Sequence, residues 1–127
     1  MKKRFSEHWK GSKQPRKQRK YRYNAPLHIK QNFMRAHISK ELIKKYSKRN
    51  IGLRKGDKVK ILRGDFKKKE GKIERVDLKK TKAYISGIER IKKDGTKTLV
   101  PIDASNLMIT ELNLDDKMRQ KALERKK

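Results

Sequence analysis

The residues of this chain best suited to chemistry are lysines placed to bind phosphate groups. The densest run, residues 67–69, lies between Gly64 and Gly71. Residues 58–61 before it alternate lysine with valine or isoleucine, which is typical of a half-buried strand, and residues 72–76 supply a second strand. Because glycine turns the chain without a Cβ clash, the pattern predicts a hairpin with a cationic tip. An ordinary solvated hairpin is the alternative, since lysine is common on exposed strand edges.

Residues that could catalyse a reaction or hold a metal ion are too dispersed to form a site. The histidines His8, His28 and His37 have no carboxylate or second histidine at metal-ligand spacing. Asp115-Asp116 is typical of a helix start rather than a metal site. Gly95-Thr96-Lys97 lacks the earlier glycine and the spacing of a phosphate-binding loop. The sequence therefore favours a protein that is not an enzyme and needs no cofactor or metal.

The net charge of the chain, +26 from 40 Lys+Arg and 14 Asp+Glu in 127 residues, indicates a polyanionic partner. A folded protein with that excess repels itself unless a polyanion compensates it. Nucleic acid is the leading candidate, because neutralising phosphates releases condensed counterions. A membrane surface would need an amphipathic helix or an apolar anchor, and we expect neither. The absence of cysteine excludes a disulfide framework and a zinc ribbon.

The charge is unevenly distributed, and this predicts three segments. Residues 1–50 hold 17 Lys+Arg and two acids, residues 51–114 hold 17 and nine, and residues 115–127 hold six and three. We therefore expect a basic N-terminal arm with short helices, a folded domain, and a C-terminal helix or tail. Within the domain, short strands are predicted around residues 59–61, 73–76, 83–85, 99–102 and 107–109. Several short strands at close spacing indicate a mainly β fold, a small barrel or sandwich.

Short helices are predicted where proline, serine or aspartate suits a helix start. Proline is favoured at the first helical position, which predicts helical segments at residues 15–22 and 27–34. Ser39 has the character of an N-cap for a helix through residue 46. A further helix is predicted over residues 115–125, because Asp115 and Asp116 stand at its start.

The first 23 residues form an arm with ten Lys+Arg and one acid. Such a segment cannot bury enough apolar surface to offset its ordering entropy, so we expect it to be disordered until a partner binds. Its aromatic residues, among them Trp9, Tyr21 and Tyr23, lie among cations. In an RNA-binding arm the rings would stack on splayed bases while the cations meet phosphates. The alternative is that these rings pack on the protein itself.

The predicted hairpin resembles the KOW motif of ribosomal and transcription-elongation proteins. The resemblance is carried by Val59, Ile61, Gly64, Lys67, Gly71, Ile73 and Val76. The motif usually has a glycine directly after the loop lysine, where this chain has Lys68. The resemblance implies a small SH3-like barrel, usually in a nucleic-acid or ribonucleoprotein setting.

Nearly the whole chain is similar to one family, the universal large-subunit ribosomal protein twenty-four in its archaeal and eukaryotic form. The similar segments are residues 12–20, 24–28, 39–42, 45–46, 88–90, 94–96 and 112–115. The resemblance implies a structural protein of the large ribosomal subunit, cytoplasmic, bound to rRNA and beside other ribosomal proteins. It further implies contact with the earliest-transcribed rRNA domain, a role in starting assembly, and a place near the nascent-chain exit. No self-association is expected.

The expected rRNA contacts fall into three groups, with Gly64 and Gly71 holding the hairpin loop in shape. In the arm they are Trp9, Arg16, Lys17, Arg19, Lys20, Tyr21, Arg22 and Tyr23. In the hairpin they are Lys58, Lys60, Arg63, Lys67, Lys68, Lys69 and Lys72. In the turn that follows they are Lys79, Lys80 and Lys82. Two alternatives remain open: a free KOW factor that acts with RNA polymerase, and a non-specific nucleic-acid-binding protein.

Overall fold

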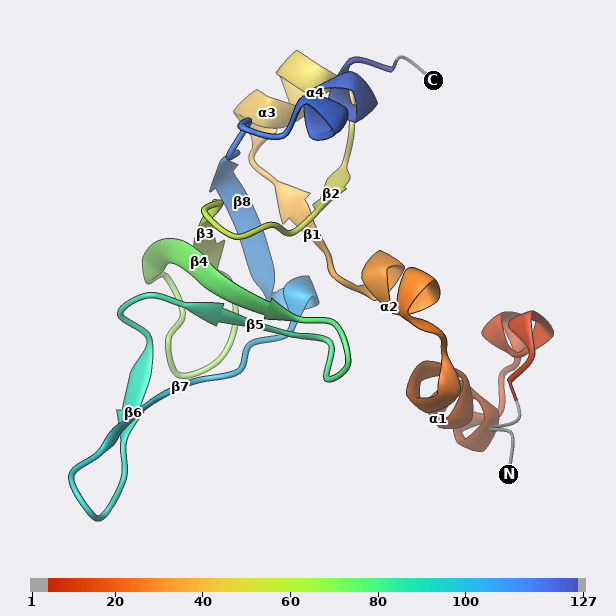
Figure 1. The fold of residues 1–127 in the computed structure, drawn as a ribbon, viewed down its shortest axis with the longest axis horizontal. Helices are drawn as coiled ribbons and strands as arrows, with labels where there is room; N and C mark the ends of the chain where they lie inside the picture. Colours follow the sequence, from red (N-terminus) through yellow and green to blue (C-terminus); the bar gives the residue numbers. More distant parts are fainter. Residues whose placement is uncertain (1–4, 126–127) are drawn as a thin grey trace.

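The computed structural model describes residues 5–125, so the four residues before them and the two after them, parts of the predicted arm and tail, lie outside the description. The helices are η1 (Glu7–Gly11), α1 (Pro15–Asn24), α2 (Leu27–Phe33), α3 (Lys40–Tyr46), η2 (Ala104–Asn106) and α4 (Lys117–Glu124). The strands are β1 (Arg35–Ile38), β2 (Asn50–Gly52), β3 (Lys58–Ile61), β4 (Glu70–Asp77), β5 (Lys82–Ile85), β6 (Glu89–Ile91), β7 (Lys97–Leu99) and β8 (Leu107–Glu111). Figure 1 shows η1, α1 and α2 extending from the sheet at one end, with the β6–β7 hairpin at the other.

The main sheet has the strand order β2-β1-β8-β3-β4-β5, and β6 and β7 form a separate hairpin. The β1–β8 pair is parallel and the remaining pairs are antiparallel. The predicted hairpin is confirmed, because β3 and β4 pair with Val59 opposite Gly71. A small β-rich domain with short helices is also confirmed. The closed barrel is not, since β2 and β5 stand at the two ends of the strand order.

Strands β1, β2 and β6 are not among the predicted strands, and β7 covers Lys97–Leu99 where a strand over 99–102 is predicted. The reason is clearest for β1. It alternates exposed and buried residues, with Ala36 and Ile38 facing the core. Four residues between a helix and a serine cap are too few for a periodic signal. The strand forms because β8 and β2, both distant in sequence, supply hydrogen-bonding partners on its two sides. Tertiary context thus decides the conformation of this segment.

The predicted helix starts are confirmed. α1 begins at Pro15, and α3 follows Ser39, whose hydroxyl accepts a hydrogen bond from the Leu42 N–H at 3.4 Å. α4 follows Asp116, whose carboxylate accepts from the Met118 N–H at 2.8 Å. These caps satisfy backbone donors that have no acceptor inside the helix.

The core is built from alternate residues of the central strands. β3 buries Val59 and Ile61, and β8 buries Leu107 and Ile109. In β3 these residues alternate with lysines that face outward, which is the period of a strand with one face on the core. Leu123 of α4 joins the same cluster, so the C-terminal helix is part of the domain.

Gly71 is required where β4 passes close to β5. A Cβ atom on Gly71 would lie 2.6 Å from Cγ2 of Ile85 and 2.7 Å from the carbonyl oxygen of Ser86. Ile85 is fully buried and the Ser86 oxygen belongs to the backbone, so neither neighbour can easily move. The role of Gly71 is therefore close approach between strands.

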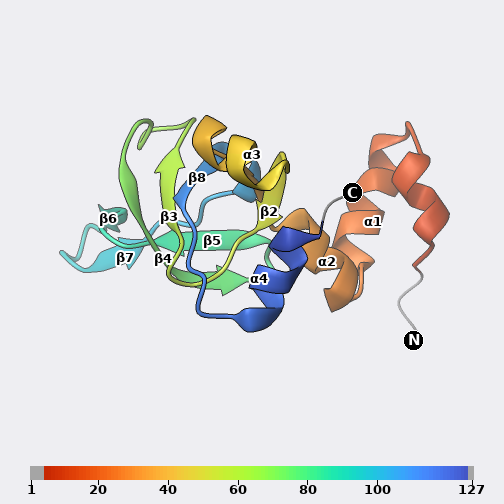
Figure 2. The same ribbon diagram turned by 90° about the horizontal axis from the view of Figure 1, so that it is seen from above.

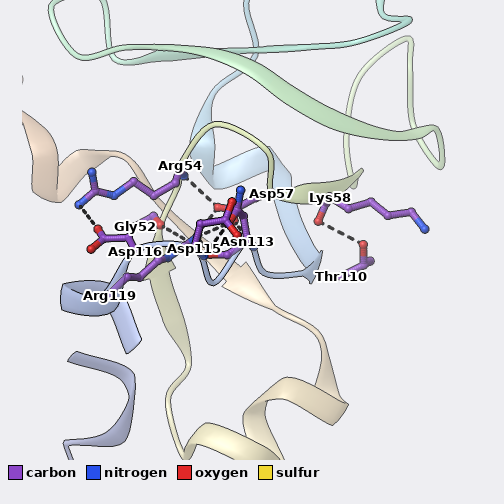
Figure 3. A network of polar contacts seen from close by, with 9 residues as sticks. All are labelled: Gly52, Arg54, Asp57, Lys58, Thr110, Asn113, Asp115, Asp116 and Arg119. Atoms are coloured by element: carbon purple, nitrogen blue, oxygen red, sulfur yellow. Dashed lines mark hydrogen bonds and ion pairs between the residues drawn. The ribbon is translucent and has the colours of Figure 1, made fainter. Parts of the chain in front are cut away.

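One buried ion pair joins the C-terminal helix to the turn before β3, as Figure 3 shows. The side chain of Asp57 is fully buried and that of Arg119 is nearly so. The guanidinium donates two hydrogen bonds to the carboxylate, from Nη1 to Oδ1 at 2.6 Å and from Nη2 to Oδ2 at 2.8 Å. Such paired, charge-assisted hydrogen bonds fix orientation as well as distance.

Backbone groups from other segments complete this network. The Asp57 carboxylate also accepts from the Arg54 N–H and the Asn113 N–H, each at 2.9 Å. Arg119 donates to the carbonyl oxygens of Asn113 and Gly52, at 2.7 and 3.1 Å. The network therefore ties together β2, the turn before β3, the segment after β8, and α4. A charge removed from water needs partners of this kind.

Replacing Arg119 with methionine should lower the free energy of unfolding by about 3–5 kcal/mol, because Asp57 would be left as a buried, uncompensated charge. Urea denaturation of the full chain measures this. The matched control is Arg90→Met, which removes an exposed ion pair with Asp65 and should cost at most about 1 kcal/mol. Equal losses in the two variants would show that the buried pair does not hold α4 on the sheet.

Replacing Gly71 with alanine should destabilise the fold by about 1–3 kcal/mol, because the added methyl group overlaps Ile85 and the Ser86 carbonyl. Thermal and urea unfolding both report the change. Gly52→Ala is the control, since nothing lies within 4 Å of a Cβ at that position. That control should stay within about 1 kcal/mol of the parent. A Gly71 variant as stable as the Gly52 variant would refute the close-approach role.

Candidate nucleic-acid interface

The loop between β3 and β4 presents three consecutive lysines on a defined backbone. The Lys67 N–H donates to the Gly64 carbonyl at 3.1 Å, and the Lys68 N–H donates to the Ile61 carbonyl at 2.8 Å. Gly64 has φ +96° and Lys68 has φ +73°, so Lys68 adopts the left-handed conformation usual for glycine. The KOW motif usually has glycine at this position, and the lysine here keeps the turn. All three lysines of residues 67–69 are exposed to solvent.

The base of this loop is anchored by Phe66. Its ring is partly buried and packs against the core cluster. The ammonium group of Lys69 lies 5.2 Å from the ring centroid, within range of a cation–π contact. The loop thus joins an apolar anchor to a charged outer surface.

The turn between β4 and β5 carries Lys79 and Lys80, both exposed. The Lys80 N–H donates to the carboxylate of Asp77 at 3.0 Å, and this backbone hydrogen bond lowers the pKa of Asp77. Lys30 of α2 donates to the Lys79 carbonyl at 3.1 Å. This contact brings α2 beside the turn, so cations from the two segments lie near each other.

Three of the expected contacts, Lys58, Lys60 and Lys82, are engaged by carboxylates of the chain itself. Their ammonium groups lie 2.9 Å from Glu111, 3.3 Å from Glu70 and 2.8 Å from Asp103. The hydrogen bond to Glu111 raises the pKa of Lys58. These lysine side chains are about one-third exposed, so each pair is weak and a phosphate could displace the carboxylate. Arg63 and Lys72 are exposed and form no ion pair with the described residues.

Helix α1 carries the arm's expected phosphate contacts on its exposed surface. These residues are Arg16, Lys17, Arg19, Lys20 and Arg22. Lys20 lies 5.4 Å from the Trp9 ring centroid, and Arg22 lies 5.8 Å from that of Phe33. Trp9 is partly buried, and the ammonium group of Lys20 lies over its ring.

The two arm tyrosines lie in different environments. Tyr21 is buried, with its ring stacked on Phe5 at 5.3 Å between centroids and edge-on to Phe33 at 5.8 Å. This is the self-packing alternative, and it leaves little of the Tyr21 ring for a base. Tyr23 is 73% exposed, so its ring remains accessible. Contact of Tyr23 with RNA stays a prediction.

The cationic elements face more than one direction. In Figures 1 and 2 the β3–β4 loop lies on the side of the sheet away from α1, while the β4–β5 turn points toward α2. The structure therefore brings the β4–β5 turn close to the arm and leaves the triple-lysine loop apart from both. A partner that contacts all of them must extend around the domain.

One cationic group near these elements is not among the residues that sequence reasoning selects. Arg75 of β4 lies directly opposite Tyr84 of β5 in the strand register. The guanidinium carbon is 4.3 Å from the centroid of the tyrosine ring. The two residues lie on consecutive strands joined by a turn, and only the register of these strands places them opposite each other.

Other kinds of site find no support in the part of the chain that the structure describes. Over residues 5–125, no group of three or more His, Cys, Asp or Glu side chains could hold a metal ion. Among the same residues, no helix has the length and apolar character needed to cross a membrane.

Comparison with known proteins assigns the chain to a family. A family model that describes the ribosomal proteins L26 of eukaryotes and their archaeal L24 counterparts matches residues 12–126. A relative from Methanosphaera stadtmanae, named "Large ribosomal subunit protein uL24", is 50% identical over 115 residues, covering 91% of this chain and 98% of the relative. A relative of the same name from Methanothrix thermoacetophila is 51% identical over 114 residues, covering 90% and 98%. The chain therefore belongs to the family of eukaryotic L26 and archaeal L24 ribosomal proteins.

Proposed function

We propose that this protein is a structural constituent of the large ribosomal subunit that binds large-subunit rRNA through its exposed lysines and arginines. Membership of a ribosomal protein family makes it a component of the ribosome rather than an enzyme. The observation that carries the proposal is the triple-lysine loop: residues 67–69 are exposed, without acidic partners in the described chain, on a turn fixed by backbone hydrogen bonds. Such a loop holds charge ready for a phosphate backbone.

Binding is driven chiefly by neutralisation of phosphates. Each lysine that meets a phosphate releases condensed counterions, which is favourable and depends on salt. A lysine already paired with a carboxylate of the chain must exchange that partner and gains less. We therefore assign the larger contribution to residues 67–69, to Lys79 and Lys80, and to α1. Lys58, Lys60 and Lys82 contribute less.

The three segments have different roles in this proposal. Residues 51–114 form a KOW domain of SH3-like barrel type that docks on folded RNA. Residues 1–50 supply the basic arm that threads between RNA helices, although β1 and the start of α3 also pack on the domain. Residues 115–127 supply α4, held by Arg119. All three would act together on RNA that extends around the domain.

The finer placement follows the resemblance to the family. We propose that the protein contacts the earliest-transcribed domain of the rRNA, helps to start assembly, and lies near the nascent-chain exit. Neighbouring ribosomal proteins would pack on the domain, and no second copy of the chain is needed. This places the protein in the cytoplasm as part of the large subunit.

The triple substitution Lys67→Ala, Lys68→Ala and Lys69→Ala should weaken binding to a folded rRNA fragment and reduce its salt dependence. Three lost phosphate contacts should lower the magnitude of the slope of log K against log salt by roughly 2 to 3. Filter binding or fluorescence anisotropy at several salt concentrations measures the slope.

The matched control removes the same charge from α3, as Lys40→Ala, Lys44→Ala and Lys45→Ala. Alanine is compatible with a helix, and α3 lies at the other end of the sheet from the loop (Figure 1). The control should keep most of the slope. Equal slopes in both triple variants would mean that net charge alone matters. Equal affinity of the parent for duplex DNA and folded rRNA would favour a non-specific nucleic-acid-binding protein.

A further inference from the structure

A surface groove beside β4 has a planar cation on its wall. The groove has a volume of 860 Å³ and is lined by residues of the turn before β3, of β4 and β5, and of β7 and the segment after it. Arg75 and Tyr84 stand on one wall, with Lys55 and Lys97 also lining the groove. The carboxylate in the lining is Glu74.

The contact between Arg75 and Tyr84 prepares this wall. The tyrosine is buried, at 8% exposure, whereas Arg75 is exposed. The guanidinium carbon lies 4.3 Å from the ring centroid, so the ring supports the guanidinium from below. Because the two residues are opposite each other in the β4–β5 register, the backbone fixes their separation. The Tyr84 ring thus holds the guanidinium in place, and the guanidinium presents its flat face to the groove.

We propose that this groove holds one unpaired RNA base against the guanidinium of Arg75, with Lys55 and Lys97 placed for the adjoining phosphates. The inference rests on the proposed rRNA binding and adds a site that binds one base by stacking. RNA is commonly bound through splayed bases that stack on aromatic rings or on arginine planes. The groove volume lies in the range of small-ligand sites.

The charges of the groove favour a nucleotide over an acidic peptide. Lys55 forms no ion pair with the described residues, and Lys97 is only loosely paired, 4.0 Å from Glu89. Glu74 would repel the closely spaced carboxylates of such a peptide. A nucleotide instead places a neutral base between the cations. Stacking of one base on an aromatic ring is worth roughly a 5- to 150-fold change in affinity, and we take the lower end of that range for the guanidinium plane.

The test uses the full chain and two single-stranded RNA pentanucleotides that differ only at the centre. One carries adenine there and the other is abasic, so both have the same phosphates. The parent should bind the adenine form at least about 5-fold more tightly. Arg75→Lys keeps the charge but removes the plane, and it should cut this preference by at least about 3-fold. The control Arg90→Lys removes an exposed guanidinium that pairs with Asp65, and it should keep the preference.

A second readout does not depend on a variant. Photo-crosslinking of a central 4-thiouridine to the parent protein should label the peptides that contain residues 75 and 84. An unchanged preference in Arg75→Lys, or labelling of the arm alone, would overturn the base site. Stronger competition by a polyglutamate peptide than by the adenine pentanucleotide would overturn it too. Folded rRNA binding is measured in parallel: if it persists, only the base site fails, and if it is also lost, the proposed function fails with it.

Discussion

The buried ion pair between Asp57 and Arg119 is the constraint on which the arrangement of the domain depends. The surface of this chain is dominated by cations that repel one another, yet this one arginine lies inside it. Its two terminal nitrogens are satisfied, because the carboxylate and two carbonyl oxygens accept their hydrogen bonds. Its buried Nε has no hydrogen-bond partner among the described residues. A buried pair adds little net stability compared with an apolar contact, but it tolerates few alternative geometries. It therefore sets where α4 and the turn before β3 lie.

The remaining cations of the described chain lie on the surface and are not needed to hold the fold together. A few lysines are paired with nearby carboxylates along the sheet, such as Lys58 with Glu111. The lysines of the β3–β4 loop have no such partner in the described chain, and the helix α1 adds further exposed cations. Surface pairs contribute little to stability, so folding does not depend on this distribution of charge. The sheet and its core fix the positions of these elements, and the β3–β4 loop and α1 carry exposed cations.

Features governed by local chemistry could be predicted from the sequence, and features governed by distant contacts could not. The β3–β4 hairpin and the Ser39 cap follow from alternation, glycine and capping chemistry. Strand β1 depends on pairing with β8, and Arg119 finds Asp57 from 62 residues away. The Arg75–Tyr84 contact likewise needs the strand register. The lysines proposed to bind phosphate could be selected by type, whereas their pairing with carboxylates could not.

Lysine acetylation footprinting of intact large ribosomal subunits is the most direct measurement of whether rRNA covers these cations. Subunits are purified from the source cells through a moderate salt wash, and reactivity is compared with that of the free chain by mass spectrometry. Lys67, Lys68 and Lys69 should react readily in the free protein and become protected in the subunit, and ribonuclease digestion should restore their reactivity. Absence of the chain from washed subunits, or equal reactivity of these lysines in both states, would contradict binding of rRNA by this surface.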